Sequence, residues 1–67
     1  MKLRVNGQEH ILDKKLANVG QVLDYFSVPW VRAAVELNDD VVDPGLFDKT
    51  PVCDGDHIEI VSFVGGG

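Results

Sequence analysis

The sequence has little cysteine and no long apolar run, and both absences restrict where the protein acts. Its single cysteine, Cys53, cannot close an internal disulfide, which is typical of a reducing compartment. No segment approaches the roughly 20 apolar residues that a membrane helix needs, and the N-terminal stretch MKLRVNGQEH lacks the continuous apolar core of a secretory signal. We therefore expect a soluble, cytoplasmic protein that makes no contact with a membrane.

Basic residues are scarce in the second half of the chain. Residues 33–67 carry one basic and eight acidic side chains, whereas residues 1–32 carry five basic and three acidic ones. Nucleic acids are bound mainly through lysine and arginine at their phosphates, so a role on DNA or RNA is not expected. The acidic half indicates either a solvated surface or a surface that meets a basic patch on a partner protein.

Residues suited to catalysis or metal binding are also few and poorly spaced. His10 and His57 have no second histidine or paired cysteines at a metal-binding spacing. Cys53 lies beside Asp54 and Asp56, and acidic neighbours disfavour the thiolate of a nucleophile, while the two aspartates flank a glycine as in a turn. No glycine-rich loop leads into a helix to hold a phosphate. We expect no metal, no bound cofactor and no catalysis by this chain alone.

The first half of the chain predicts a hairpin followed by one helix. The stretch KLRV alternates polar and apolar residues, and Asn6-Gly7 after it is a strong signal for a two-residue hairpin turn. Asn18 is a good N-cap, with Gln21 three positions later as in a capping box and apolar residues then recurring at helical spacing. We expect Pro29 to end this helix, because proline pushes the preceding residue out of the helical region.

The second half predicts short strands separated by turns. A strand over 34–37, a polar turn and a second apolar run at 41–42 suit another antiparallel pair. Asp43 then caps a single helical turn that begins with Pro44. After the turn DGD, a final strand is expected over 57–64.

This order of elements predicts an α+β domain, with one main helix and a short helical turn packed on a mixed sheet of four to five strands. The last strand is long and apolar, so it buries most surface in the centre of the sheet, parallel to the first strand. That arrangement is the β-grasp fold of ubiquitin. The core is expected to contain Leu3, Val5, Val22, Leu23, Phe26, Val35, Ile58 and Ile60.

Alternation along the final strand predicts two different faces. If Ile58 and Ile60 face the helix, Val61 and Phe63 point away from the core, and exposed apolar residues commonly mark a protein contact. The alternative is that the end of the sheet or the side chain of Trp30 covers them. The alternation by itself leaves both possibilities open.

Three glycines close the sequence, and they divide it into a β-grasp domain over 1–64 and a flexible tail over 65–67. Without Cβ atoms, Gly65, Gly66 and Gly67 fit extended in a narrow channel and reach roughly 10 Å. The group at the end of that reach is the Gly67 carboxylate, which reacts only after another protein activates it. The alternative is a frayed terminus without chemistry.

Three stretches carry a resemblance to a known family: MKLRVNG at the start, AVELNDDVV in the middle and DGDHIEIVSFVGGG at the end. Over its full length the chain resembles the ThiS family, the sulfur carriers of thiamine biosynthesis in the ubiquitin-like β-grasp superfamily. In that family a ThiF adenylating enzyme uses ATP and magnesium to form an acyl adenylate on the terminal glycine. Sulfur that originates from cysteine then replaces the nucleotide to give a thiocarboxylate, which the thiazole synthase ThiG uses.

The resemblance implies a role for each residue near the end of the chain. Gly67 would be the site of adenylation and thiocarboxylate formation, Gly66 would precede it in the channel of the activating enzyme, and Gly65 would extend the flexible reach. The docking surface would contain Val61, Phe63 and Val64. ATP and magnesium would be used by a ThiF-like partner, the sulfur by a ThiG-like partner, and the free carrier would be a monomer and no enzyme.

Two other functions fit the same residues. One is a related β-grasp protein, either the small subunit of molybdopterin synthase or another ubiquitin-like carrier or modifier. The other is an interaction domain whose glycines take part in no chemistry.

Overall fold

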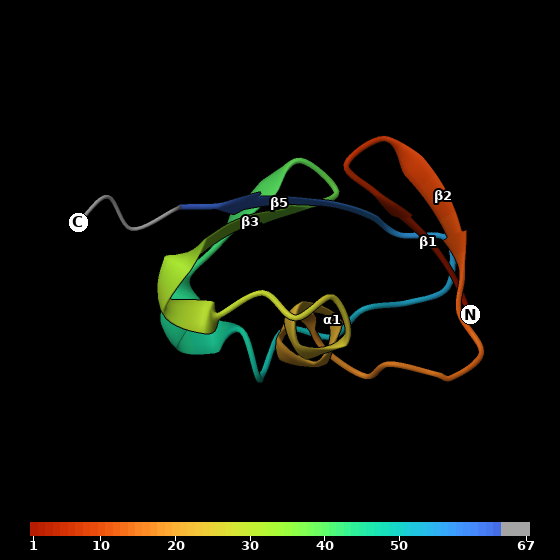
Figure 1. The fold of residues 1–67 in the computed structure, drawn as a ribbon, viewed down its shortest axis with the longest axis horizontal. Helices are drawn as coiled ribbons and strands as arrows, with labels where there is room; N and C mark the ends of the chain where they lie inside the picture. Colours follow the sequence, from red (N-terminus) through yellow and green to blue (C-terminus); the bar gives the residue numbers. More distant parts are fainter. Residues whose placement is uncertain (64–67) are drawn as a thin grey trace.

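The computed structural model describes residues 1–63 of the chain and contains one mixed sheet with a helix on one side (Figure 1). Within these residues the strands follow the order β2-β1-β5-β3-β4, with β5 parallel to β1 and antiparallel to β3. The last strand is therefore central, as predicted. The elements are β1 (Lys2–Val5), β2 (Gln8–Ile11), α1 (Val19–Tyr25), η1 (Trp30–Arg32), β3 (Ala33–Leu37), β4 (Asp40–Val42), η2 (Pro44–Leu46) and β5 (His57–Ser62).

The predicted hairpin joins β1 to β2. Val5 and Gln8 are register partners, so the turn contains only the two residues between them. Asn6 has a φ of 51° and Gly7 a φ of 81°, which places both in the left-handed region that a two-residue hairpin turn requires. Asparagine and glycine are the residues that reach this region at least cost, and this explains why the dipeptide identified the turn.

The predicted helix begins where its cap indicates but ends earlier than expected. The Asn18 side chain accepts a hydrogen bond from the Gln21 amide at 2.9 Å, while the Gln21 side chain accepts from the Ala17 amide at 2.8 Å. Pro29 does not end the helix. Ser27 adopts a φ of 59°, and this left-handed residue stops α1 before the proline is reached.

No helix in the described residues 1–63 has the length and apolar character needed to cross a membrane.

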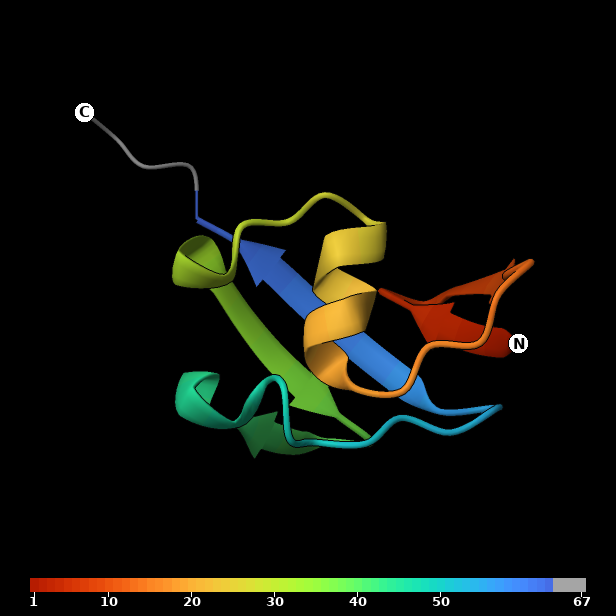
Figure 2. The ribbon, with the colours of Figure 1, turned by 90° about the horizontal axis from the view of Figure 1, so that it is seen from below.

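The core lies between α1 and the inner side of the sheet (Figure 2). Six of the eight predicted members are buried, whereas Phe26 and Ile60 are only partly buried and pack against the cluster. The sequence prediction missed Phe47, which is 1% exposed and the largest fully buried side chain among the described residues. Other buried residues outside the predicted set are Leu12, Leu16, Val19, Ala33, Val42 and Val52.

Trp30 covers the helical side of the core from η1, a second short turn that the sequence did not predict. A Cβ atom at Gly20 would overlap the indole ring, so the absence of a side chain there lets the ring lie directly on α1. The indole Nε1 donates a hydrogen bond to Asp24 at 2.9 Å, and the ring meets Phe47 edge to face with centroids 6.1 Å apart. Trp30 is therefore an edge cover for the core.

Candidate functional site

The central strand β5 has one buried and one exposed side, as its alternation predicts. Ile58 is 1% exposed and lies in the core, while Val61 is 57% exposed and Phe63 is 58% exposed. Trp30 does not cover these two residues, because it packs on Gly20 and Phe47 at the helical side of the sheet. Val61 and Phe63 therefore belong to an open apolar surface.

Two sets of backbone contacts fix where β5 ends. Along one edge it pairs with β3 over five register positions, from Leu37↔Ile58 to Ala33↔Ser62, and the Phe63 amide continues by donating to the Arg32 carbonyl at 2.7 Å. Along the other edge β5 pairs with β1 as far as Val5↔Ile58, and beyond that point the Asn6 side chain binds the backbone of β5. Its Oδ1 accepts from the Ile60 amide at 2.7 Å and its Nδ2 donates to the Ile60 carbonyl at 3.1 Å.

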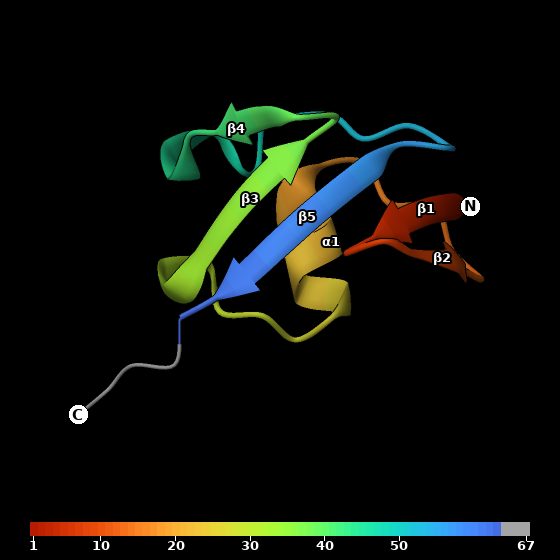
Figure 3. The same cartoon turned by 90° about the horizontal axis from the view of Figure 1, so that it is seen from above.

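The sheet side opposite α1, seen in Figure 3, holds a groove of about 380 Å³ over β3, β4 and β5. We call this side the outer face. Ala34, which has a small side chain, lies opposite Val61 in the register, and both residues line the groove. Its walls include Val41, Val61, Phe63, Pro44, Glu36 and Glu59.

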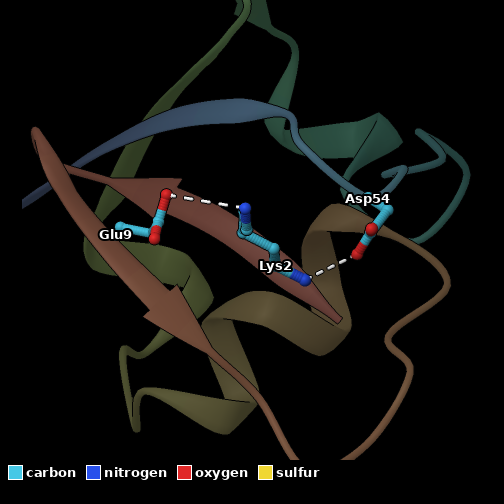
Figure 4. Close-up of polar contacts among 3 residues, drawn as sticks. All are labelled: Lys2, Glu9 and Asp54. Carbon is cyan, nitrogen blue, oxygen red and sulfur yellow. Dashed lines mark hydrogen bonds and ion pairs between the residues drawn. The ribbon is translucent and has the colours of Figure 1, made fainter.

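The charged residues of the outer face are distributed unevenly. Glu36 on β3 and Glu59 on β5 are both exposed and are direct register partners. The ion pair found within residues 1–63 lies outside the groove, on strands β1 and β2 (Figure 4). It joins Lys2 Nζ to Glu9 at 3.9 Å. Both side chains of that pair are about half exposed, so it contributes little to stability.

The aspartates before β5 are structural. The Asp54 side chain accepts a hydrogen bond from the Lys2 amide, as Figure 4 shows, and thereby ties the turn to the start of β1. The Asp56 carboxylate accepts from the Cys53 amide at 2.7 Å and from Asn38 Nδ2 at 3.2 Å. Among the described residues no group of three or more histidine, cysteine, aspartate or glutamate side chains is placed to hold a metal ion. Cys53 itself is a free, exposed thiol.

The structure places some of the predicted site residues and adds others. Val61 and Phe63 line the groove, whereas Val64, Gly65, Gly66 and Gly67 lie outside the described residues. The sequence prediction missed the wall that β3 and β4 provide. Alternation in AAVEL, with Val35 buried, was the available signal, because it places the residues on either side of Val35 on the outer face.

Comparisons with known proteins agree on one family. The model of the ThiS family matches residues 2–67. The crystal structure of the thiamine biosynthesis protein ThiS from Geobacter metallireducens superimposes with a TM-score of 0.83 at 39% identity, covering 100% of both chains. The sulfur carrier protein ThiS of Bacillus subtilis is 31% identical over 97% of this chain and 98% of its own length. A thiazole synthase of Paramagnetospirillum magneticum is 37% identical over the whole chain, which spans only 20% of the length of that protein.

Proposed function

The chain belongs to the ThiS family, with its β-grasp fold, and from this premise we propose that it is a sulfur carrier of thiamine biosynthesis that carries sulfur at Gly67. In the proposed sequence, the Gly67 carboxylate attacks ATP at a ThiF-like adenylating enzyme, which releases pyrophosphate and leaves an acyl adenylate. A sulfur nucleophile then displaces AMP, and the product is a C-terminal thiocarboxylate. The chain is the substrate of these steps, and ATP with magnesium binds to the partner.

The observation that carries this proposal is that the apolar residues of the outer face lie close to Gly67 along the chain. Gly67 lies four positions after Phe63, so the two are at most about 14 Å apart in any conformation. An enzyme that holds Gly67 in its active site therefore covers the end of β5. Val61 and Phe63 are more than half exposed there, and they offer such an enzyme an apolar surface to bury.

We propose a ThiG-like thiazole synthase as the second partner, the one that consumes the sulfur. The similarity of this chain to a segment of the Paramagnetospirillum magneticum thiazole synthase supports it, because two functions combined in one protein commonly act together. A cytoplasmic location is part of the same proposal. It is supported by Cys53, because an exposed free thiol persists most readily in a reducing compartment.

An intact-mass measurement tests the proposal. The purified protein is incubated with the adenylating enzyme of its own organism, ATP, magnesium and a cysteine-derived sulfur source. We expect the mass to rise by the difference between sulfur and oxygen, with fragmentation placing the change on Gly67. An unchanged mass, with an enzyme shown to be active on another carrier, would refute the proposed function.

Two variants serve as controls for the position of the chemistry. Deletion of Gly67 removes the proposed acceptor, and one alanine added after Gly67 displaces the carboxylate from its position. Neither change touches the described core, so we expect wild-type melting and no mass shift. A sulfur shift in either variant would show that the terminal carboxylate is not the acceptor.

A further inference from the structure

We propose that Glu36 and Glu59 bind a basic side chain of the adenylating enzyme, while an apolar side chain of the same enzyme segment enters the adjacent groove. This inference rests on the proposed function, because it names the chemistry of the surface that docks on the outer face. It concerns residues that lie away from the glycines and that take no part in the sulfur chemistry itself.

The first observation is the register of the two glutamates. Glu36 and Glu59 face each other across the antiparallel pair β3 and β5. Directly opposed residues have Cβ atoms about 4.5–5.5 Å apart, and like charges in that position destabilise a sheet. The pair therefore costs the free protein stability in the middle of its sheet, where the fold itself requires no charge.

The second observation is that no cation within the described residues 1–63 forms an ion pair with these glutamates. On the β4 side the register partner of Glu36 is Val41, which carries no charge. On the β1 side the partner after Val5↔Ile58 is Asn6, whose side chain is already bonded to the backbone of Ile60.

Arg4 on β1 lies on the same face, two residues before Asn6, the residue opposite Glu59. Arg4 is the partner of His57 on β5, and it forms no ion pair with either glutamate. The ion pairs of residues 1–63 therefore leave both carboxylates open to a cation from a partner. A guanidinium or ammonium group placed over both carboxylates meets two acceptors at once, and charge-assisted hydrogen bonds of this kind are the strong ones.

The third observation identifies the source of the cation as a protein. The two glutamates form part of the wall of the apolar groove beside Ala34 and Val41, so the same surface offers an anionic and an apolar contact within one side-chain length. A free metal ion would bind only the anionic contact and would leave the apolar contact unused. Phe63 is part of the groove wall and can lie at most about 14 Å from Gly67, so the enzyme that activates the tail is the protein placed to make both contacts.

The test compares two double variants of equal charge change. E36Q/E59Q removes the anionic pair with little change in shape. D13N/D48N removes two exposed carboxylates that lie outside the groove and make no hydrogen bond within residues 1–63. Binding of each to the adenylating enzyme is measured by calorimetry in low and in high salt, and melting is measured without the enzyme.

We expect E36Q/E59Q to bind roughly tenfold more weakly than the wild type in low salt, with a smaller difference in high salt, because screening weakens exposed charge pairs. We expect its melting temperature to be equal to or above that of the wild type, since the repulsion is gone. D13N/D48N should retain wild-type affinity. If the glutamates took no part in binding, E36Q/E59Q would not combine a lower affinity for the enzyme with an equal or higher melting temperature.

Three results would overturn the inference. They are wild-type affinity of E36Q/E59Q, an equal loss of affinity in both double variants, and a loss of affinity in E36Q/E59Q that is the same in low and in high salt. Failure of the proposed function is recognised separately, because the wild-type protein itself would then neither bind the adenylating enzyme nor gain sulfur.

Discussion

Replacement of Phe63 by alanine is expected to weaken binding of the adenylating enzyme while leaving the fold intact. Phe63 is 58% exposed, so less than half of its side chain is withdrawn from water on folding. Full burial of a phenylalanine contributes about 1.5–3 kcal/mol, and the truncation should therefore reduce the free energy of unfolding by about 1 kcal/mol. For a domain of this size, the melting temperature should fall by about 4–8 °C.

Phe47→Ala is the matched control, since it removes the same side chain from the core. Phe47 is 1% exposed and packs edge to face on Trp30. A buried phenylalanine replaced by alanine costs about 3–5 kcal/mol. At roughly 0.05–0.15 kcal/mol per residue, that is comparable to the whole stability of so short a chain. We expect the Phe47→Ala protein to be largely unfolded.

Calorimetric titration with the adenylating enzyme, beside thermal melting, separates the two roles. In the proposed complex the exposed part of Phe63 is buried, so its removal should cost about 1–2 kcal/mol of binding energy, or roughly tenfold in Kd. Wild-type affinity of Phe63→Ala would refute the reasoning. So would a loss of folded structure as severe as that of Phe47→Ala, because Phe63 would then belong to the core.

Three further changes test the local structure. Gly20→Ala should displace the Trp30 indole and lower stability by about 1 kcal/mol despite the better helix propensity, with red-shifted tryptophan emission; unchanged emission would contradict this. Asn6→Ala should lower the urea midpoint by the equivalent of about 2 kcal/mol, because both hydrogen bonds to Ile60 are lost, and a midpoint equal to that of the wild type would contradict it. Ser27→Gly should raise the melting temperature, since its φ of 59° favours glycine, and a lower temperature would exclude that explanation.

The sequence predicted those elements whose signals are local. Asn6-Gly7 specifies its turn through backbone preference alone, and Asn18 caps its helix with a single side-chain contact. The end of α1 was not predictable in the same way. Serine gives little sign of a left-handed conformation, so Pro29 was a more visible but incorrect signal than Ser27.

Buried residues in loops were the larger omission. Phe47 lies just after η2, in a segment with no strand or helix periodicity, and it enters the core only because the chain folds back under the sheet. The candidate site shows the same limit. Alternation along β5 predicted that Val61 lies outside, but the groove also needs Val41, and only the pairing of β4 with β3 brings that residue near.

The pairing of β1 with β5 has a consequence for how the protein is made. During synthesis one edge of β1 stays unpaired until residues 57–62 have been made, because these residues form β5, its parallel partner. Such long-range pairings form late, since a large loop must close before any hydrogen bond rewards it. A ribosome that stalls before β5 therefore leaves a hairpin and a helix with their apolar sides uncovered, a species prone to aggregation and proteolysis. The strand that carries Val61, a residue of the proposed docking surface, also completes the fold, so a chain that lacks this strand should not fold.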